Sequence, residues 1–126
     1  MKPELYTSMS VGSDATKVLH FSELSFRAER IYWIHGPSGR RGGHAHKRLR
    51  QSFFCLAGEV TIALNDGIVS EICKLTAGQG ALLLPGLWRD IEPLSEGSIL
   101  LVIASDPFDE NDYIREFSEF GEWKNA

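Results

Sequence analysis

Short extended runs follow one another along this 126-residue chain, and glycine, proline or aspartate separates each run from the next. The run 59–64 (EVTIAL) alternates polar and apolar residues, as a half-buried strand does. Asp66 and Gly67 follow, a pair typical of two-residue hairpin turns, and the alternation resumes over 68–75. Many short strands joined by tight turns predict an antiparallel β-sandwich or barrel. The other expected strands cover 30–34, 51–56, 80–84 and 98–104.

Only the C-terminal region has the residue spacing of a helix. Asp109 or Asn111 can cap its start and Gly121 is a typical stop, so we expect one helix over 109–121. We expect a single domain over residues 1–126, which is long enough for one sizeable core. An aromatic stripe recurs at helical spacing, and we interpret it as packing against the barrel or a partner subunit: Tyr113, Phe117 and Phe120.

Composition and charge argue against several classes of protein. The net charge is −4 with no long run of one sign, which does not suit a general nucleic-acid binder. No stretch approaches the length of a membrane span, and the N-terminus lacks the apolar core of a signal peptide. We therefore expect a cytoplasmic protein with no membrane or nucleic-acid partner. In that compartment Cys55 and Cys73, which lie in apolar runs, are expected to be reduced, buried and inert.

The most informative stretch is 36–58 (GPSGRRGGHAHKRLRQSFFCLAG). Its histidines, His44 and His46, are one residue apart, so in a strand both imidazoles point to one side and enter one cavity. Gln51 follows, and Gly58 stands at the next turn. A glycine, His-x-His, an acidic residue and a second glycine form the first motif of the cupin family, which this stretch resembles with Gln51 in the acidic place. The resemblance implies an all-β cupin jelly roll, an antiparallel sandwich or barrel, with a short C-terminal helix.

The same comparison argues against a bound metal. The second cupin motif places a histidine shortly after a Pro-Gly turn, and here Arg89 stands in that place. A metal-binding cupin uses both histidines of the first motif, a carboxylate and this third histidine. Gln51 is a poor neutral ligand, and Arg89 offers no lone pair and adds a fixed positive charge. Two histidines alone do not hold a divalent ion against water, so we expect no metal. His20 and His35 lack motif spacing.

Without a metal, the two motif histidines are available for acid–base chemistry. An imidazole has an ordinary pKa of about 6.5, so it takes and returns a proton at neutral pH. Two imidazoles in one cavity suppress each other's protonation, which keeps one of them free to act as a base. A pair of core histidines without chemistry is the alternative. The loop 40–43 (RRGG) and Lys47 favour a functional site, because a basic, glycine-rich backbone approaches a phosphate closely.

Five runs share their pattern with one family within the cupins: 30–34 (RIYWI), 41–51 (RGGHAHKRLRQ), 55–58 (CLAG), 85–89 (PGLWR) and 103–115 (IASDPFDENDYIR). Together they resemble the nucleoside-diphosphate-sugar 3,4-ketoisomerases, also called WxcM-like cupins. The similarity covers residues 26–120, most of the chain, and the histidine run combined with the DYIR tail is highly specific.

The resemblance implies an activity and a set of site residues. Family members convert dTDP-4-keto-6-deoxyglucose to its 3-keto isomer through an enediol, without a cofactor, for the deoxyamino sugars of surface polysaccharides. The resemblance implies that His44 is the base, that Tyr32 relays a proton and that His46 shapes the cavity, so these are the predicted catalytic residues. It also implies a homodimer with an exchanged N-terminal strand. The predicted substrate-binding residues are Arg41, near the diphosphate, and Arg89, Lys47, Gln51 and Trp88.

The chain departs from the family pattern near its N-terminus. There 11–18 (VGSDATKV) does not reproduce the R-G-x-L or Y-G-x-L run whose first residue reaches the sugar. This departure favours one alternative, a cupin that binds a nucleotide sugar without turnover. A metal-dependent cupin enzyme is a second alternative, and epimerisation in place of carbonyl migration is a third.

Overall fold

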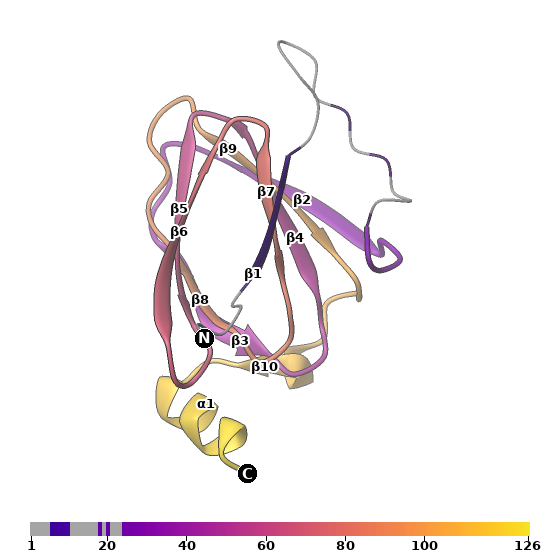
Figure 1. The fold of residues 1–126 in the computed structure, drawn as a ribbon, viewed down its shortest axis with the longest axis vertical. Helices are drawn as coiled ribbons and strands as arrows, with labels where there is room; N and C mark the ends of the chain where they lie inside the picture. Colours follow the sequence, from indigo (N-terminus) through magenta and orange to yellow (C-terminus); the bar gives the residue numbers. More distant parts are fainter. Residues whose placement is uncertain (1–5, 11–17, 19, 21–23) are drawn as a thin grey trace.

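The computed structural model describes residues 6–10, 18, 20 and 24–126. Within these residues two antiparallel five-stranded sheets form a sandwich, and a short helix lies at one end of it (Figure 1). The sheet orders are β1-β7-β4-β9-β2 and β10-β3-β8-β5-β6. The elements are β1 (Tyr6–Ser10), β2 (Arg30–His35), β3 (Arg41–His46), β4 (Gln51–Ala57), β5 (Glu59–Asn65), β6 (Ser70–Thr76), β7 (Gln79–Leu83), β8 (Trp88–Ile91), β9 (Ile99–Ala104), β10 (Tyr113–Ile114) and α1 (Phe117–Lys124).

The core lies between the two sheets and is built from alternate residues of their strands. In β5, Val60, Ile62 and Leu64 are buried, whereas the residues between them are half-buried. Both cysteines, Cys55 and Cys73, belong to the same buried cluster, as their apolar surroundings predicted. Each sheet therefore turns one apolar face to the other, and the prediction of an all-β antiparallel sandwich is confirmed.

All six expected extended runs are strands, namely β2, β4, β5, β6, β7 and β9. The hairpin between β5 and β6 is wider than the two-residue turn that the sequence predicted, because the strands pair only as far as Asn65 and Ser70. The Asp66 carboxylate accepts hydrogen bonds from the backbone N–H groups of Ile68 and Val69, at 2.9 and 2.7 Å. This aspartate closes a four-residue loop with its own side chain.

The C-terminal helix is shorter and later than the expected 109–121. Asp109 caps only a single 3₁₀ turn (Glu110–Asp112), after which the chain becomes extended at Tyr113. Strand β10 then pairs with β3, which places Tyr113 opposite His46. The α-helix begins at Phe117, and Gly121 lies inside it rather than at its end. Pairing of Tyr113 and Ile114 with β3 therefore outweighs the helical spacing of the aromatic residues, and it places this segment next to His46.

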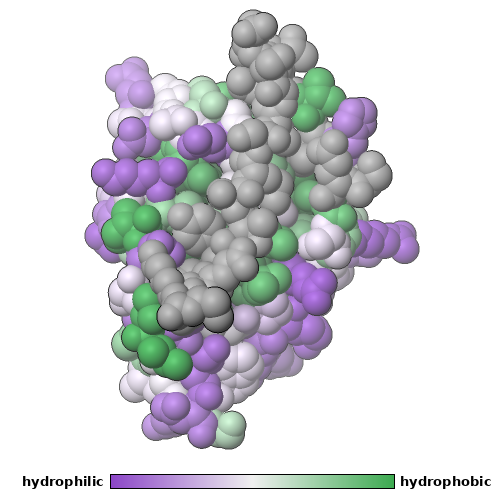
Figure 2. Space-filling view, viewed as in Figure 1, coloured by the Kyte–Doolittle hydropathy of each residue, from purple (hydrophilic) through white to green (hydrophobic). Residues whose placement is uncertain are grey.

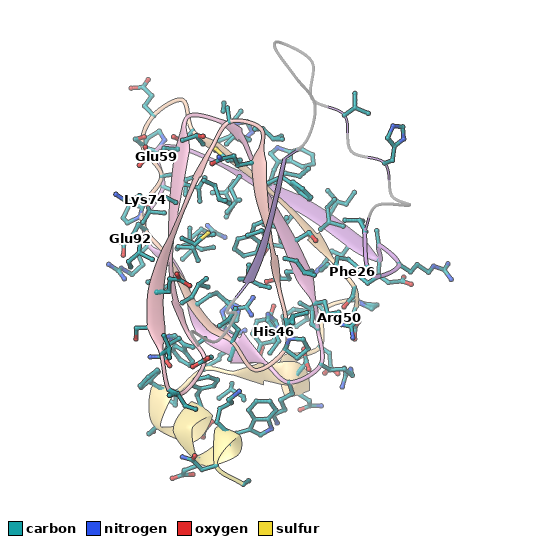
Figure 3. The ribbon with its side chains drawn as sticks, viewed as in Figure 1. Phe26, His46, Arg50, Glu59, Lys74 and Glu92 are labelled. Atoms are coloured by element: carbon teal, nitrogen blue, oxygen red, sulfur yellow. The ribbon has the colours of Figure 1, made fainter. Side chains whose placement is uncertain are left out.

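The aromatic stripe divides between two environments. Phe120 is fully buried and packs with Trp88, Ala45 and Ile114 in a small cluster under α1, as the packing interpretation predicted. The half-exposed ring of Phe117 contacts Trp88 edge-on, with 5.2 Å between ring centroids. Tyr113 instead packs with His44 and His46, and these three rings form the histidine cluster. Figure 3 shows His46 of that cluster near the end of the sandwich that carries β10 and α1.

The N-terminal strand β1 pairs antiparallel with β7 at an edge of the first sheet, with Ser8 opposite Ala81. The departure from the family pattern at 11–17 lies outside the described residues. Figure 2 shows hydrophilic and hydrophobic residues interspersed over the coloured part of one face. No helix in the described part of the chain is long and apolar enough to cross a membrane.

Candidate active site

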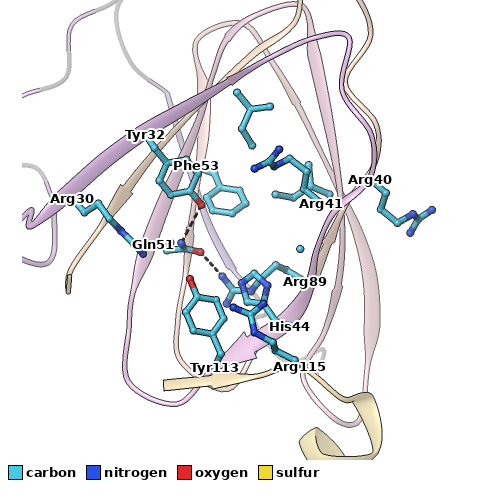
Figure 4. A pocket seen from close by; sticks show the side chains of 13 residues that line it. Arg30, Tyr32, Arg40, Arg41, His44, Gln51, Phe53, Arg89, Tyr113 and Arg115 are labelled. Atoms are coloured by element: carbon cyan, nitrogen blue, oxygen red, sulfur yellow. Dashed lines mark hydrogen bonds between the residues drawn. The ribbon is translucent and has the colours of Figure 1, made fainter. Parts of the chain in front are cut away.

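A cavity of about 440 Å³ lies between the two sheets and draws its walls from both (Figure 4). Strands β2 and β4 supply one wall, strands β3 and β8 supply the other, and the tail around β10 contributes the remainder. The lining residues that carry polar chemistry are Arg30, Tyr32, Arg40, Arg41, His44, Gln51, Arg89, Tyr113 and Arg115. Five of the eight predicted site residues therefore meet in one cavity.

The two motif histidines lie on the same side of β3, but only His44 lines the cavity. His46 is fully buried behind it, and the two rings meet edge to face with 4.8 Å between their centroids. The pairing of β3 with β8 shifts register between Gly42 and His44. Gly42 has a φ of 92°, and a Cβ there would stand 2.8 Å from the backbone oxygen of Arg89, so glycine lets the strands approach closely. The expectation that both imidazoles enter the cavity is therefore corrected.

Both histidines are neutral at neutral pH. Burial, together with the positive charge of Arg89, lowers the pKa of His44 from 6.5 to about 4. Burial and the same charge lower the pKa of His46 to about 2. A neutral imidazole at the wall of a polar cavity is able to accept a proton, so His44 has the state that a general base requires.

A chain of hydrogen bonds joins three of the predicted residues across the cavity (dashed lines in Figure 4). The Gln51 amide nitrogen donates to the Tyr32 hydroxyl at 3.5 Å, and its carbonyl oxygen accepts from the Arg89 guanidinium at 2.6 Å. Arg89 also donates twice to the backbone oxygen of Leu87, at 3.1 and 2.9 Å. Gln51, which stands in the acidic position of the cupin motif, thus connects the Arg89 guanidinium to the Tyr32 hydroxyl through its neutral amide.

Burial changes the acidity of both ends of this chain. Arg89 is 1% exposed, and burial lowers its pKa to about 10, so the guanidinium still carries its charge at neutral pH. Burial also raises the pKa of Tyr32, and the negative charge that Tyr113 can carry adds to this effect. The Tyr32 phenol is therefore protonated at neutral pH and available as a proton donor.

The donor set of the cavity does not suit a divalent metal. Beside His44 stand the Gln51 amide and the Arg89 guanidinium, which offer one weak ligand and a positive charge. Among the described residues, no group of three or more histidine, cysteine, aspartate or glutamate side chains is placed to hold a metal ion.

Arginines surround the rest of the cavity. Arg41, predicted near the diphosphate, is exposed and lies on the wall beside Arg40, whose guanidinium pairs with Glu92 at 2.9 Å. Arg115 stacks over the Tyr113 ring, with 4.2 Å from its guanidinium carbon to the ring centroid. Such a concentration of guanidinium groups suits an anionic ligand that needs several charge-assisted hydrogen bonds.

The structure places two of the predicted substrate-binding residues away from the cavity. Lys47 is exposed at the end of β3, where its backbone N–H donates to the carbonyl of Asp112. Trp88 precedes Arg89 in β8, and successive residues of a strand point to opposite faces. The Trp88 ring therefore lies on the outer face, packed against Phe120 and bonded through Nε1 to Asp90 at 3.2 Å.

Sequence reasoning missed three residues of the site: Tyr113, Arg115 and Arg30. The Tyr113 ring centroid lies 4.9 Å from that of His44 and 4.4 Å from that of His46. We assigned Tyr113 to a packing stripe because the tail was expected to be helical. The DYIR run itself was the available signal, since it matched the family as closely as the histidine run did.

An all-β sandwich of this kind, with histidine and arginine side chains lining a cavity between its sheets, defines a cupin-like protein. The chain belongs to the family described as FdtA: WxcM-like, C-terminal, which matches residues 7–125. The motif-based prediction of this family is therefore confirmed.

Relatives of the chain share both sequence and fold. A TDP-4-oxo-6-deoxy-alpha-D-glucose-3,4-oxoisomerase from Aneurinibacillus thermoaerophilus is 37% identical over 100 residues, which cover 77% of this chain and 72% of the relative. A 3,4-ketoisomerase from Helicobacter canadensis is 33% identical with a TM-score of 0.87, covering 96% of this chain and 98% of that one. The sugar 3,4-ketoisomerase of Thermoanaerobacterium thermosaccharolyticum, solved in complex with TDP, is 28% identical with a TM-score of 0.86, covering 96% and 95%.

Replacement of Gln51 by leucine tests whether the amide bridge stabilises the buried cation. Gln51→Leu is expected to lower the free energy of unfolding by about 2 kcal/mol, because the charged and buried Arg89 guanidinium loses one of its hydrogen bonds. Urea denaturation measures the change. Ser52→Ala is the matched control, since Ser52 is the next residue, equally buried, and its hydroxyl has no hydrogen-bond partner among the residues that the structure describes. Equal losses in the two variants would contradict the bridging role.

Proposed function

We propose that the protein converts a TDP-linked 4-keto-6-deoxyglucose to its 3-keto isomer. The observation that carries this proposal is His44, a neutral imidazole on the wall of a cavity lined with arginines. The 37% identical relative is named as an oxoisomerase of this sugar nucleotide. A variant of the Thermoanaerobacterium enzyme, 28% identical with a TM-score of 0.86 over 98% of this chain and 96% of its own, was solved in complex with TDP-4-keto-6-deoxyglucose.

The reaction needs only proton transfers. The carbonyl at C-4 acidifies the proton on C-3, and His44 removes that proton to leave an enediolate between C-3 and C-4. The hydroxyl proton on O-3 moves to O-4, with Tyr32 as the relay, and the carbonyl re-forms at C-3. C-4 takes up the proton that His44 holds. One C–H bond breaks and one forms, so no oxidant, reductant or metal is required.

Arg89 and Tyr32 stabilise the charge that develops on oxygen. The enediolate carries its negative charge on the two oxygens next to the reacting carbons, and a buried cation held in place by Gln51 needs no rearrangement to meet it. Tyr32, bonded to the same amide, presents a protonated phenol to this side of the cavity. His46 supports His44 from behind and does not touch the substrate.

The arginines hold the nucleotide part of the substrate. Arg41 is exposed at the wall and carries no ion pair among the described contacts, so its guanidinium is available to a diphosphate. Arg115 is engaged with Glu110 in a two-bond pair, at 2.6 and 2.8 Å, and a phosphate can displace that exposed carboxylate.

The homodimer and the cytoplasmic location are also part of this proposal. Strand β2 is an edge strand of the first sheet, and two of its outward apolar side chains, Ile31 and Trp33, are 45% and 60% exposed. Large apolar residues on an open edge favour association with a second copy. The two buried cysteines suit a reducing compartment.

Proton NMR of dTDP-4-keto-6-deoxyglucose incubated with the protein tests the reaction directly. We expect signals of the 3-keto isomer to appear, and we expect His44→Asn to lower the rate by at least about 10²-fold because the general base is lost. The variant should still bind TDP, which calorimetry measures. His35→Asn, an exposed histidine on the same sheet as Tyr32, is the control and should keep the full rate. Substrate that stays unchanged with the wild-type protein would rule out the proposed reaction, and binding without turnover would favour the non-catalytic alternative.

The pH dependence of kcat/KM follows from the lowered pKa of His44. Because the base is neutral above a pKa of about 4, kcat/KM should hold from pH 7 into the acidic range and fall only as the pH approaches 4. Folding stability must be followed in parallel by fluorescence. His44 binds a proton more readily when unfolded, so its contribution to the stability, present above pH 6.5, is lost as the pH falls toward 4. An acid limb near pH 6.5 in fully folded protein would contradict the assignment of His44 as the base.

Charge placed on the exposed edge of β2 tests the homodimer. Sedimentation of the wild-type protein should give the mass of two chains, and Trp33→Glu should shift the population to single chains because a carboxylate is costly to bury. Ile68→Glu is the control: Ile68 is 90% exposed in the loop between β5 and β6, outside the first sheet and both its edge strands, and the variant should remain a dimer. A wild-type protein that sediments as a single chain would overturn this part of the proposal.

A further inference from the structure

Asp112 is a buried carboxylate with three hydrogen-bond partners next to the histidine cluster. It is 3% exposed and ends the 3₁₀ turn that leads into β10. Its Oδ1 accepts from the backbone N–H of Arg48 at 2.7 Å, and its Oδ2 accepts from the backbone N–H of Leu49 at 3.1 Å. The same Oδ2 lies 3.1 Å from Nδ1 of His46. Both carboxylate oxygens of Asp112 therefore accept hydrogen bonds from the backbone that follows β3.

These contacts determine which nitrogen of His46 carries the proton. The Asp112 carboxylate accepts from two backbone N–H groups, and a carboxylate only accepts hydrogen bonds. Nδ1 of His46 must therefore be the donor. The imidazole is neutral at neutral pH and has one N–H, so Nε2 carries a lone pair.

The bare nitrogen belongs to a ring at the base of the cavity. Nε2 of His46 is buried and has no hydrogen-bond partner among the described residues. The ring that carries it contacts two residues of the cavity wall, His44 and Tyr113, at centroid distances of 4.8 and 4.4 Å. A buried acceptor without a partner costs free energy, and a role in catalysis is one reason for a protein to keep such a group.

We propose that Asp112 is a positioning residue for the isomerisation: it holds His46 as the Nδ1–H tautomer and so keeps an unoccupied proton acceptor behind His44 and Tyr113. The inference rests on the proposed function, because it assigns this acceptor to the same cavity. The opposite tautomer would put the N–H on Nε2 and leave no acceptor on that side of the ring. An imidazolium formed at His46 would in turn be stabilised by the Asp112 carboxylate, as in other Asp–His pairs.

The first test reads the tautomer without any substrate. In protein labelled with ¹⁵N-histidine, NMR distinguishes a protonated ring nitrogen from a bare one. We expect His46 of the wild-type protein to carry its proton on Nδ1, and we expect Asp112→Asn to raise the share of the Nε2–H form, because the amide can donate to Nδ1. Asp109→Asn is the matched control. Asp109 lies at the start of the same turn and pairs with Arg48 at the surface, at 3.0 Å, without a contact to His46. A proton on Nε2 in the wild-type protein would overturn the inference.

The second test separates positioning from support of the fold. Asp112→Asn should lower kcat about 10²- to 10⁴-fold while Asp109→Asn keeps it, and in a His46→Gln background Asp112→Asn should cause no further loss. A full additional loss in that background would overturn the inference, since Asp112 would then act without His46. If Asp112→Asn does not fold, the wild-type tautomer remains decisive. A wild-type protein that lacks turnover but shows the Nδ1–H tautomer would contradict the proposed function alone, since the tautomer is read without substrate.

Discussion

A buried guanidinium determines the chemistry of this sandwich. Arg89 lies between the sheets, held by the Gln51 amide and the Leu87 carbonyl, and burial does not remove its charge at neutral pH. Burial, and after it this charge, lowers the pKa of both His44 and His46 and keeps them unprotonated at neutral pH. A metal-binding cupin places a cation among its histidines, whereas here a side chain supplies the positive charge. In the proposed reaction His44 is therefore a neutral imidazole that can accept a proton.

The site depends equally on how β3 is held at its two edges. On one side it pairs with β8, and glycine at position 42 allows the close approach that brings Arg89 beside His44. On the other side it pairs with β10, which carries Tyr113 to the histidine rings. The carboxylate of Asp112 joins the residues after β3 to the start of β10. Positioning of the candidate base is thus a property of three strands together.

Sequence reasoning succeeded where the information is local. Alternation of polar and apolar residues identified β5 and β6, and short apolar runs between turn residues identified four more strands, because both signals are visible within a few positions. The spacing of His44 and His46 correctly placed both on one side of a strand. The prediction failed for the tail, where the aromatic spacing suited a helix but pairing with β3 was decisive. It failed for Trp88 because strand β8 was not predicted, and in a strand the neighbouring side chains of Trp88 and Arg89 point to opposite faces.

The sequence by itself determined the class of fold and the family, since strand periodicity and the histidine, arginine and tail motifs are each contained in a short continuous run of residues. Only the tertiary structure decided which side chains share the cavity. His46 and Asp112 are 66 residues apart, and Gln51 and Arg89 are 38 apart. Contacts of this kind depend on strand register and on the packing of two sheets. Neither is encoded in any local spacing, because register is set by pairing partners that lie elsewhere in the chain.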